Sequence, residues 1–488
     1  MDLARFLRRW LPLVLLVVIS IAAWQTAQAA DIDEAREDAF VYERELTTPV
    51  LSARRIPETL RAPVIDDEVG PALDALITAT GDYPACLIAE VDDRVLRAHN
   101  PLLPLVPASN QKLLTTFAAL AEFGPDHRFQ TTVAVTGPVA DGIVSGDLVL
   151  IGGGDPYLST ADWWTQYEEG TARYHTRLED LADAVVAAGI TEVQGGVLGD
   201  DSLFDELRVG PWAERLIVQQ QSGPLSALAV NEGHTTWPAT FSSMAARTQA
   251  ADPAQHAAQV FTRLLDERGV TITASAQRGA APAGATVIAS IDSAPVLDLA
   301  THVNSYSSNY GAEVLVKHLG LRRVGAGSTE AGAAAVETIL LEQGFDLSGV
   351  VIDDGSGLAE TDLVTCQLLV DLLDRAGADS AFADTLSVGG ERGSLRNRVD
   401  ETIADGLVWA KTGTLNGVTA LSGYVDSSSE AGTSIAFAYI ANGEVAGVGA
   451  GINGDLVSAQ EPFLLELAEY PVGPTVGELD PDAAVASN

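Results

Sequence analysis

The chain has 488 residues, with 67 Asp or Glu against 28 Lys or Arg, which gives a formal net charge of -39. This balance argues against nucleic acid as a partner, because phosphate binding needs a basic patch. The hydrophobic fraction of 47% excludes a disordered polyanion, and the length predicts two or three domains. Only three of the basic residues are lysines, namely Lys112, Lys317 and Lys411.

The N-terminal residues predict an export signal over residues 1–29. The first nine residues contain three arginines, residues 11–23 form an apolar run, and Ala27-Gln28-Ala29 resembles a cleavage site. The alternative is an uncleaved anchor that associates with the membrane, since the apolar run is close to the length of a short span. In both cases we expect a protein of the cell envelope or the extracellular space.

The next segments predict an acidic spacer followed by the start of a folded domain. Residues 30–55 are acidic and irregular, whereas the apolar runs 86–91 and 94–98 predict a β-hairpin. After Pro107, apolar residues at helical spacing predict a helix that stops at Gly124-Pro125. The first candidate motif lies in this helix.

The sequence pattern changes between residues 130 and 288, where short runs typical of β-strands are interrupted by glycine. The runs are 130–135, 146–151 and 192–198, and one helix is expected near residues 178–188. This pattern predicts a smaller α+β domain, inserted at 130–288 into a larger domain made of residues 56–129 and 289–470.

The second half of the larger domain reads as helices followed by a β-meander. Helices are expected at 295–303, 310–319 and 333–343, and strands at 407–411, 418–425 and 433–440. Residues 471–488 lack basic residues and predict a disordered tail. The predicted fold class is therefore α+β, with an antiparallel sheet flanked by helices.

The cysteine and histidine positions argue against a disulfide framework and against a metal site. Cys86 and Cys366 both lie among apolar residues, and we expect them to be buried free thiols. The seven histidines never occur at metal-ligand spacing. We therefore expect neither a metal nor another cofactor.

The first candidate motif is Ser109-Asn110-Gln111-Lys112. Three-residue spacing places the hydroxyl of Ser109 and the amine of Lys112 on one face of a helix. An amine that burial keeps neutral can take the proton of a serine nucleophile. Alone, the pattern is more typical of a helix cap beside a solvated lysine.

A second motif, Lys411-Thr412-Gly413-Thr414, ends an apolar strand. The glycine permits a ligand backbone to approach, while the lysine and the two threonine hydroxyls suit a carboxylate. The alternative is a strand that ends in a turn. Between the two motifs lies Ser307-Ser308-Asn309, which alone is typical of a helix cap.

The order Ser-x-x-Lys, Ser-x-Asn, Lys-Thr-Gly is shared by β-lactamases and penicillin-binding proteins. With Ser307 198 positions after Ser109, the chain resembles the low-molecular-mass penicillin-binding proteins of the D-alanyl-D-alanine carboxypeptidase/endopeptidase family. The resemblance covers residues 50–465. Four further segments support it, namely 152–156, 199–205, 353–358 and 393–398.

The resemblance implies a penicillin-binding/β-lactamase-like transpeptidase domain and serine acyl transfer on peptidoglycan stem peptides, with β-lactams as inhibitors. It implies catalytic roles for Ser109, Lys112, Ser307, Asn309 and Lys411. It further implies that Thr412, Gly413 and Thr414 bind substrate. Two departures from the family stand out: Ser308 replaces a common Asp, and the insertion is short.

Several other functions remain open at this point. Within serine acyl transfer, one alternative is an endopeptidase that cuts peptide cross-links. Another is a β-lactamase, if the acyl-enzyme is hydrolysed fast. A different class is a wall sensor that binds stem peptides or β-lactams without turnover. A third is an acidic structural wall protein, in which the three motifs occur by accident.

Overall fold

The computed structural model describes residues 70–471, apart from positions 72 and 93 and the segments 167–173, 240–245 and 444–450. The predicted export signal, the acidic spacer and the tail beyond Pro471 lie outside the described residues. Within the described ranges, no helix is both long and apolar enough to cross a membrane. Nor do the described His, Cys, Asp and Glu side chains form a group of three or more that could hold a metal ion.

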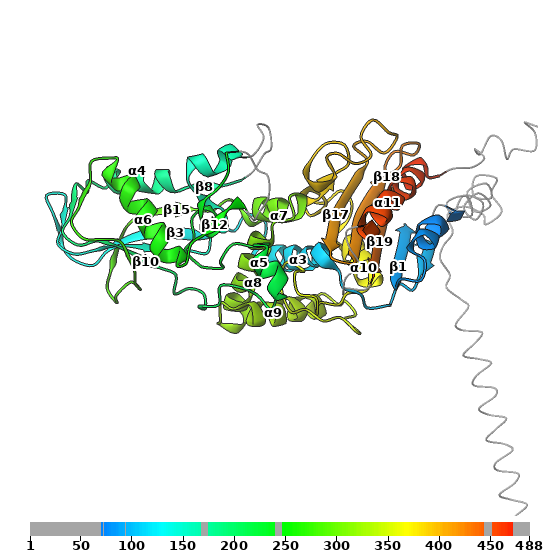
Figure 1. Cartoon of the computed structure of the whole chain (residues 1–488), viewed down its shortest axis with the longest axis horizontal. Helices are drawn as coiled ribbons and strands as arrows, with labels where there is room; N and C mark the ends of the chain where they lie inside the picture. The colour runs from blue at the N-terminus through cyan, green and yellow to red at the C-terminus, as the bar shows by residue number, and fades with distance from the viewer. Residues whose placement is uncertain are drawn as a thin grey trace, which may run out of the picture. The chain divides into compact units, whose positions relative to one another are not determined.

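A six-stranded antiparallel sheet organises the larger part of the fold (Figure 1). Its order is β16-β17-β18-β19-β1-β2. The strands are β1 (Ala85–Val91), β2 (Arg94–His99), β16 (Ser387–Val388), β17 (Val408–Leu415), β18 (Val418–Asp426) and β19 (Ser434–Asn442). The predicted hairpin and the predicted meander are both confirmed, and pairing of β1 with β19 joins them into one sheet.

Both faces of this sheet are covered, because successive side chains of a strand point to opposite sides. In β1, Cys86 and Ile88 pack in the core on one face, whereas Leu87 and Ala89 pack in the core on the other. The first core holds α3 (Gln111–Phe123), α7 (Val296–Ser305), α8 (Asn309–Val324), α9 (Thr329–Glu342) and α10 (Cys366–Ala376); the second holds helical residues 73–80 and α11 (Gly451–Glu469). The helices predicted from periodicity are thus confirmed, with slightly different ends.

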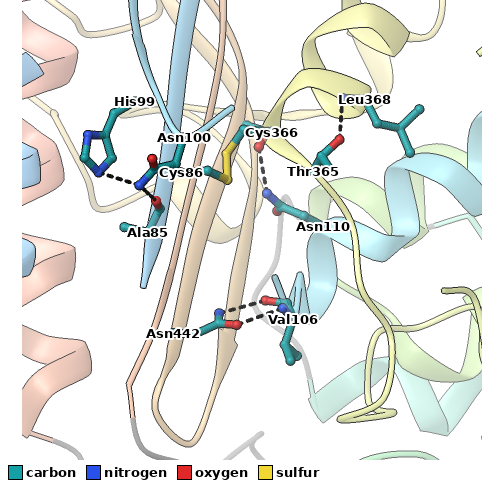
Figure 2. Close-up of a disulfide and its surroundings, with 11 residues drawn as sticks. Ala85, Cys86, His99, Asn100, Val106, Asn110, Thr365, Cys366, Leu368 and Asn442 are labelled. Carbon is teal, nitrogen blue, oxygen red and sulfur yellow. Dashed lines mark hydrogen bonds between the residues drawn. A yellow bond between two sulfur atoms is a disulfide. The ribbon is translucent and has the colours of Figure 1, made fainter. Parts of the chain in front are cut away.

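The cysteines correct the sequence prediction, since they form a disulfide instead of two free thiols (Figure 2). Cys86 lies in β1 and Cys366 is the first residue of α10, and their Cα atoms are 5.9 Å apart. Both are fully buried, as predicted. Their separation of 280 residues concealed the pairing, because only the packing of α10 on the sheet brings them together.

The inserted part has its own sheets and its own core (Figure 1). A five-stranded sheet has the order β14-β10-β6-β3-β15, and a four-stranded sheet has the order β13-β9-β5-β4. Its strands are β3 (Gln130–Val135), β4 (Val139–Ala140), β5 (Ile143–Val144), β6 (Leu148–Ile151), β7 (Leu158–Ser159), β8 (Thr176–Arg177), β9 (Glu192–Val193), β10 (Val197–Asp200), β11 (His234–Thr236), β12 (Thr248–Gln249), β13 (Thr271–Ile272), β14 (Gln277–Arg278) and β15 (Thr286–Asp292); its helices are α4 (Leu178–Ala187), α5 (Glu214–Val218) and α6 (Pro253–Asp266). Helices α4 and α6 pack in the core of these sheets.

One strand predicted in this part is divided in two. The run 192–198 becomes β9 and β10, which belong to different sheets. Gly195 and Gly196 separate them, and a Cβ on Gly195 would lie 2.1 Å from Asp147 Oδ1 and 2.7 Å from Gly146 O. The glycines therefore mark a close backbone approach instead of the interior of a strand.

The segment around α5 leaves the inserted sheets and packs on the larger part. Trp212, Leu216 and Leu225 share a core with Tyr310 of α8 and Leu415 of β17. The inserted part thus contributes side chains next to the motifs identified in the sequence. The predicted α+β class with an inserted α+β domain is confirmed, while the boundaries 130 and 288 stay a prediction.

Candidate active site

Ser109 lies in a short 3₁₀ turn, Ala108–Asn110, directly before α3. Ala108 has φ of +47°, a left-handed conformation that residues other than glycine adopt rarely. The neighbouring sheet holds this turn in place, because Asn110 Nδ2 donates to Ser422 Oγ at 2.8 Å. The serine is therefore presented at a fixed point above β18.

The segment that leads into the turn is also fixed (Figure 2). Asn442, the last residue of β19, accepts from Val106 N at 2.8 Å and donates to Val106 O at 3.0 Å. This side chain pairs with the backbone as a neighbouring strand would. Together with Asn110, it anchors both sides of Ser109 to the sheet.

Lys112 is fully buried, and its amine is directed at three acceptors. Nζ lies 2.9 Å from Ser109 Oγ, 2.7 Å from Asn309 Oδ1 and 2.5 Å from Ser356 O. Burial lowers the pKa of Lys112 to about 7, although the nearby carboxylates of Asp354, Glu313 and Asp362 act to raise it. A large share of the amine is therefore neutral near pH 7 and can accept the serine proton.

The second motif forms the start of α8. Ser307 has φ of +57°, again left-handed, while Ser308 caps the helix by accepting from Gly311 N at 3.1 Å. The residue that departs from the family pattern thus has a structural task, as expected for a side chain that does not face substrate. Asn309 contacts Lys112 and donates from Nδ2 to Gln221 O at 2.7 Å.

The third motif lies on β17, beside the second. The buried Lys411 donates from Nζ to Ser307 Oγ at 2.9 Å and to Thr412 O at 2.8 Å. Burial, and then the charge of Lys112, hold the pKa of Lys411 well below its ordinary value. The charge of Lys112 therefore disfavours the charged form of Lys411.

Gly413 lies where β17 passes the serine turn. A Cβ at this position would be 2.8 Å from Pro107 O and 3.2 Å from Ser109 N. Glycine is thus needed for the strand to approach the turn so closely. Beside it, Thr412 Oγ1 donates to Ser394 Oγ at 2.7 Å, so a residue of the segment 393–398 also belongs to the site.

The three motifs meet at one cleft of about 330 Å³. Its lining consists of Ser109, Arg215, Leu216, Gln219, Gln221, Ser307, Asn309, Leu358, Thr412, Thr414, Leu415 and Asn416. Lys112 and Lys411 lie behind this lining and contact Ser109 and Ser307. At the cleft, Arg215 of α5 forms an ion pair with Glu360.

Several residues of the site were missed by sequence reasoning. The carboxylate of Asp354 accepts hydrogen bonds from the backbone amides of Ser356, Gly357 and Ala359 at 3.0, 2.6 and 2.8 Å. Trp212 Nε1 also donates to Asp354 Oδ2 at 2.9 Å. The glycines of segment 353–358 were a visible signal for a tight turn there. The carbonyls of Gln221 and Ser356 had no such signal, because any residue carries a backbone carbonyl.

Comparisons with known proteins agree with this geometry. The model of the D-Ala-D-Ala carboxypeptidase 3 (S13) family matches residues 78–243 and 236–459. The chain is 31% identical to the D-alanyl-D-alanine carboxypeptidase of Actinomadura sp. (strain R39), over 75% of this chain and 77% of that protein. It is 30% identical to the carboxypeptidase DacB of Mycolicibacterium smegmatis, over 88% and 90%.

Among solved structures, penicillin binding protein 4 of Haemophilus influenzae matches the fold with a TM-score of 0.67. The match covers 81% of this chain and 99% of that one, at 20% sequence identity. A second structure of the same protein holds a β-lactam and matches with a TM-score of 0.65. These matches confirm the penicillin-binding fold that the sequence motifs predicted.

Proposed function

Because this chain belongs to the D-Ala-D-Ala carboxypeptidase 3 (S13) family, we propose that it is a serine carboxypeptidase that removes the terminal D-alanine from peptidoglycan stem peptides. The observation that carries the proposal is the 2.9 Å contact between Ser109 Oγ and the Nζ of the fully buried Lys112. A nucleophile and a base of suitable pKa within hydrogen-bond distance are the minimum requirement for acyl transfer.

Acylation begins with Ser109. Its Oγ attacks the carbonyl carbon of the penultimate D-alanine while Lys112 Nζ takes the hydroxyl proton. The N–H groups of Ser109 and Thr414 stabilise the oxyanion, a role supported by the position of both residues at the cleft. The C–N bond then breaks, leaving an ester on Ser109.

Departure of the terminal D-alanine requires a proton on its nitrogen. Ser307 relays to this nitrogen the proton that Lys112 took from Ser109: its hydroxyl gives one hydrogen to the nitrogen and regains one from the Lys112 ammonium. The Lys411–Ser307 contact of 2.9 Å, which holds this hydroxyl in place, supports the role. Lys411 holds the hydroxyl of Ser307 by donating a hydrogen bond to it, and Asn309 orients Lys112 and the substrate amide. Thr412 and Thr414 bind the terminal carboxylate. Water finally hydrolyses the ester, and β-lactams acylate Ser109 by the same route.

We also propose that the protein is exported to the cell wall. Its substrate lies there, and the pattern of residues 1–29 is that of an export signal. The buried disulfide between Cys86 and Cys366 adds support, because disulfides form and persist in oxidising compartments. Whether the signal is cleaved or anchors the protein is answered by N-terminal sequencing of the exported form.

The test is labelling by a fluorescent penicillin. Ser109→Ala should abolish labelling, whereas Ser290→Ala, a change at an exposed serine of β15, should leave it intact. If Ser109→Ala is still labelled, Ser109 is not the nucleophile. Digestion of purified muropeptides then separates the alternatives, since release of free D-alanine marks a carboxypeptidase and separation of cross-linked stems marks an endopeptidase. Labelling without either product would mark a sensor.

A further inference from the structure

Helix α8 presents two polar side chains one turn apart toward the base. Asn309 contacts Lys112 directly. Glu313, four residues later, is completely buried, although Glu is among the residues least often found without solvent contact. Nothing in the acyl-transfer steps above uses this carboxyl group.

Glu313 reaches Lys112 through one intervening residue. Its Oε1 accepts from Gly355 N at 3.1 Å and from Ser356 N at 2.9 Å. The carbonyl oxygen of the same Ser356 accepts from Lys112 Nζ at 2.5 Å. The backbone of Ser356 is therefore held by Glu313 on one side and contacts the base on the other.

The segment around Ser356 has little freedom to find another position. Thr115 Oγ1 of α3 donates to Gly355 O at 2.8 Å. At Gly357, which has φ of +75°, a Cβ would lie 1.8 Å from Ala108 O, next to the nucleophile. A small displacement of this segment is thus passed to both Ser109 and Lys112.

We propose that Glu313 is a positioning residue for acylation: by accepting the amide hydrogens of Gly355 and Ser356, it directs the Ser356 carbonyl at Lys112 and so keeps the amine on Ser109. The inference rests on the proposed function, since Lys112 is its base. Glu313 itself does not touch the substrate or the reacting atoms.

The charges around the base indicate that Glu313 acts as a hydrogen-bond acceptor and not as a counter-ion. Burial, and then the charge of Asp354, raise the pKa of Glu313 to about 8, so the carboxyl is largely protonated at neutral pH. Asp354 and Asp362 also face Lys112, and the charge of Lys112 in turn opposes that of Lys411. The protonated carboxyl keeps its acceptor oxygen, and only the ionised form of Glu313 raises the pKa of Lys112.

The test measures the rate of penicillin acylation between pH 5 and 9. Glu313→Gln keeps the acceptor oxygen and should stay within about threefold of the wild type at every pH. Glu313→Ala leaves the two amides without their acceptor and should slow acylation about tenfold or more. The pH below which the acylation rate of Glu313→Ala falls, the acid limb of its profile, should also be lower than in the wild type. The reason is that a displaced Ser356 carbonyl no longer stabilises the ammonium form of Lys112. Glu337→Ala, at an exposed position of α9, is the control and should match the wild type.

Each other outcome overturns the inference. If Glu313→Ala is acylated as fast as the wild type, the inference is wrong. It is also wrong if Glu313→Ala is slow but its pH profile has not moved, since loss of folded protein lowers the rate equally at every pH. Equal impairment of Glu313→Gln and Glu313→Ala would mean that charge matters and the acceptor does not. Should Glu313→Ala not fold, Glu313→Asp replaces it: withdrawing the carboxyl from the amides should give a several-fold loss with the same shift. Failure of the wild type itself to be labelled would refute the proposed function instead.

Discussion

Lys317 donates a hydrogen bond from Nζ to Asp205 Oδ1 at 2.5 Å, and so joins α8 to the inserted part. It is the one lysine of the chain outside the three motifs, and its side chain is 1% exposed against 29% for Asp205. Lys317 lies two helical turns after Asn309 on α8, on the same face. The helix that carries the second motif is therefore tied at one turn to the base and at another to the inserted part.

Asp205→Asn should lower the free energy of unfolding by about 3 kcal/mol, because it leaves the buried Lys317 charge without its partner. Chemical denaturation measures this change. The matched control is Asp183→Asn, which breaks the exposed pair with Arg268 and should cost less than about 1 kcal/mol. Similar losses in the two variants would contradict the stabilising role of the buried pair.

Trp212→Phe should slow penicillin acylation several-fold, because Asp354 Oδ2 loses the indole donor at 2.9 Å and the segment that carries Ser356 is held less firmly. A hydrogen bond to a charged group contributes about 1.5–3 kcal/mol. Trp164→Phe is the control: its Nε1 donates to Ser159 Oγ in the inserted part, away from the cleft, and acylation should not change. Equal effects of the two substitutions would point to general loss of packing.

Acylation should depend on pH through Lys112. Since the neutral amine is the base and its pKa is lowered to about 7, the rate should fall about tenfold per pH unit below 7 and level off above it. Stopped-flow labelling with a chromogenic β-lactam gives the profile. Lys112→Arg should be inactive throughout, because a guanidinium does not lose its proton. A rate that is constant from pH 5 to 8 would exclude Lys112 as the base.

Removing the disulfide by the paired change Cys86→Ala and Cys366→Ala should lower the free energy of unfolding by about 2–5 kcal/mol. The loss arises because the reduced unfolded chain is no longer constrained over 280 residues. Denaturation of wild type and variant, each with and without reductant, provides the measurement. Reductant should destabilise only the wild type; an effect of equal size on the variant would show that it acts elsewhere.

Much of the larger part could be predicted from sequence, because its elements have clear periodicity. The helix after Pro107 and the strand that leads to Lys411 each place a lysine beside an apolar run, and the two lysines contact the cleft residues Ser109 and Ser307. Motif order then linked Ser109, Ser307 and Lys411, although they are far apart in the chain.

What sequence reasoning missed depends on backbone groups and on long-range packing. The carbonyls of Ser356 and Gln221 carry no residue-type signal. Glu313 lies in the predicted helix 310–319 with nothing in the sequence to single it out, since only the three-dimensional structure buries it beside Lys112. The apolar neighbours of Cys86 correctly indicated burial but could not reveal its partner in α10.

The pairing of β1 with β19, with Ala85 opposite Ala441, sets the order in which the enzyme can be assembled. A chain synthesised from its N-terminus presents Ser109 and Lys112 long before Lys411, while the inserted strands, all between residues 130 and 292, can pair as soon as they are made. Pairings so distant in sequence form late, since closing the intervening loop costs entropy first. Ser109 is therefore synthesised early, but Lys411 and its strand join it last. A nascent or truncated chain that lacks them has no complete cleft.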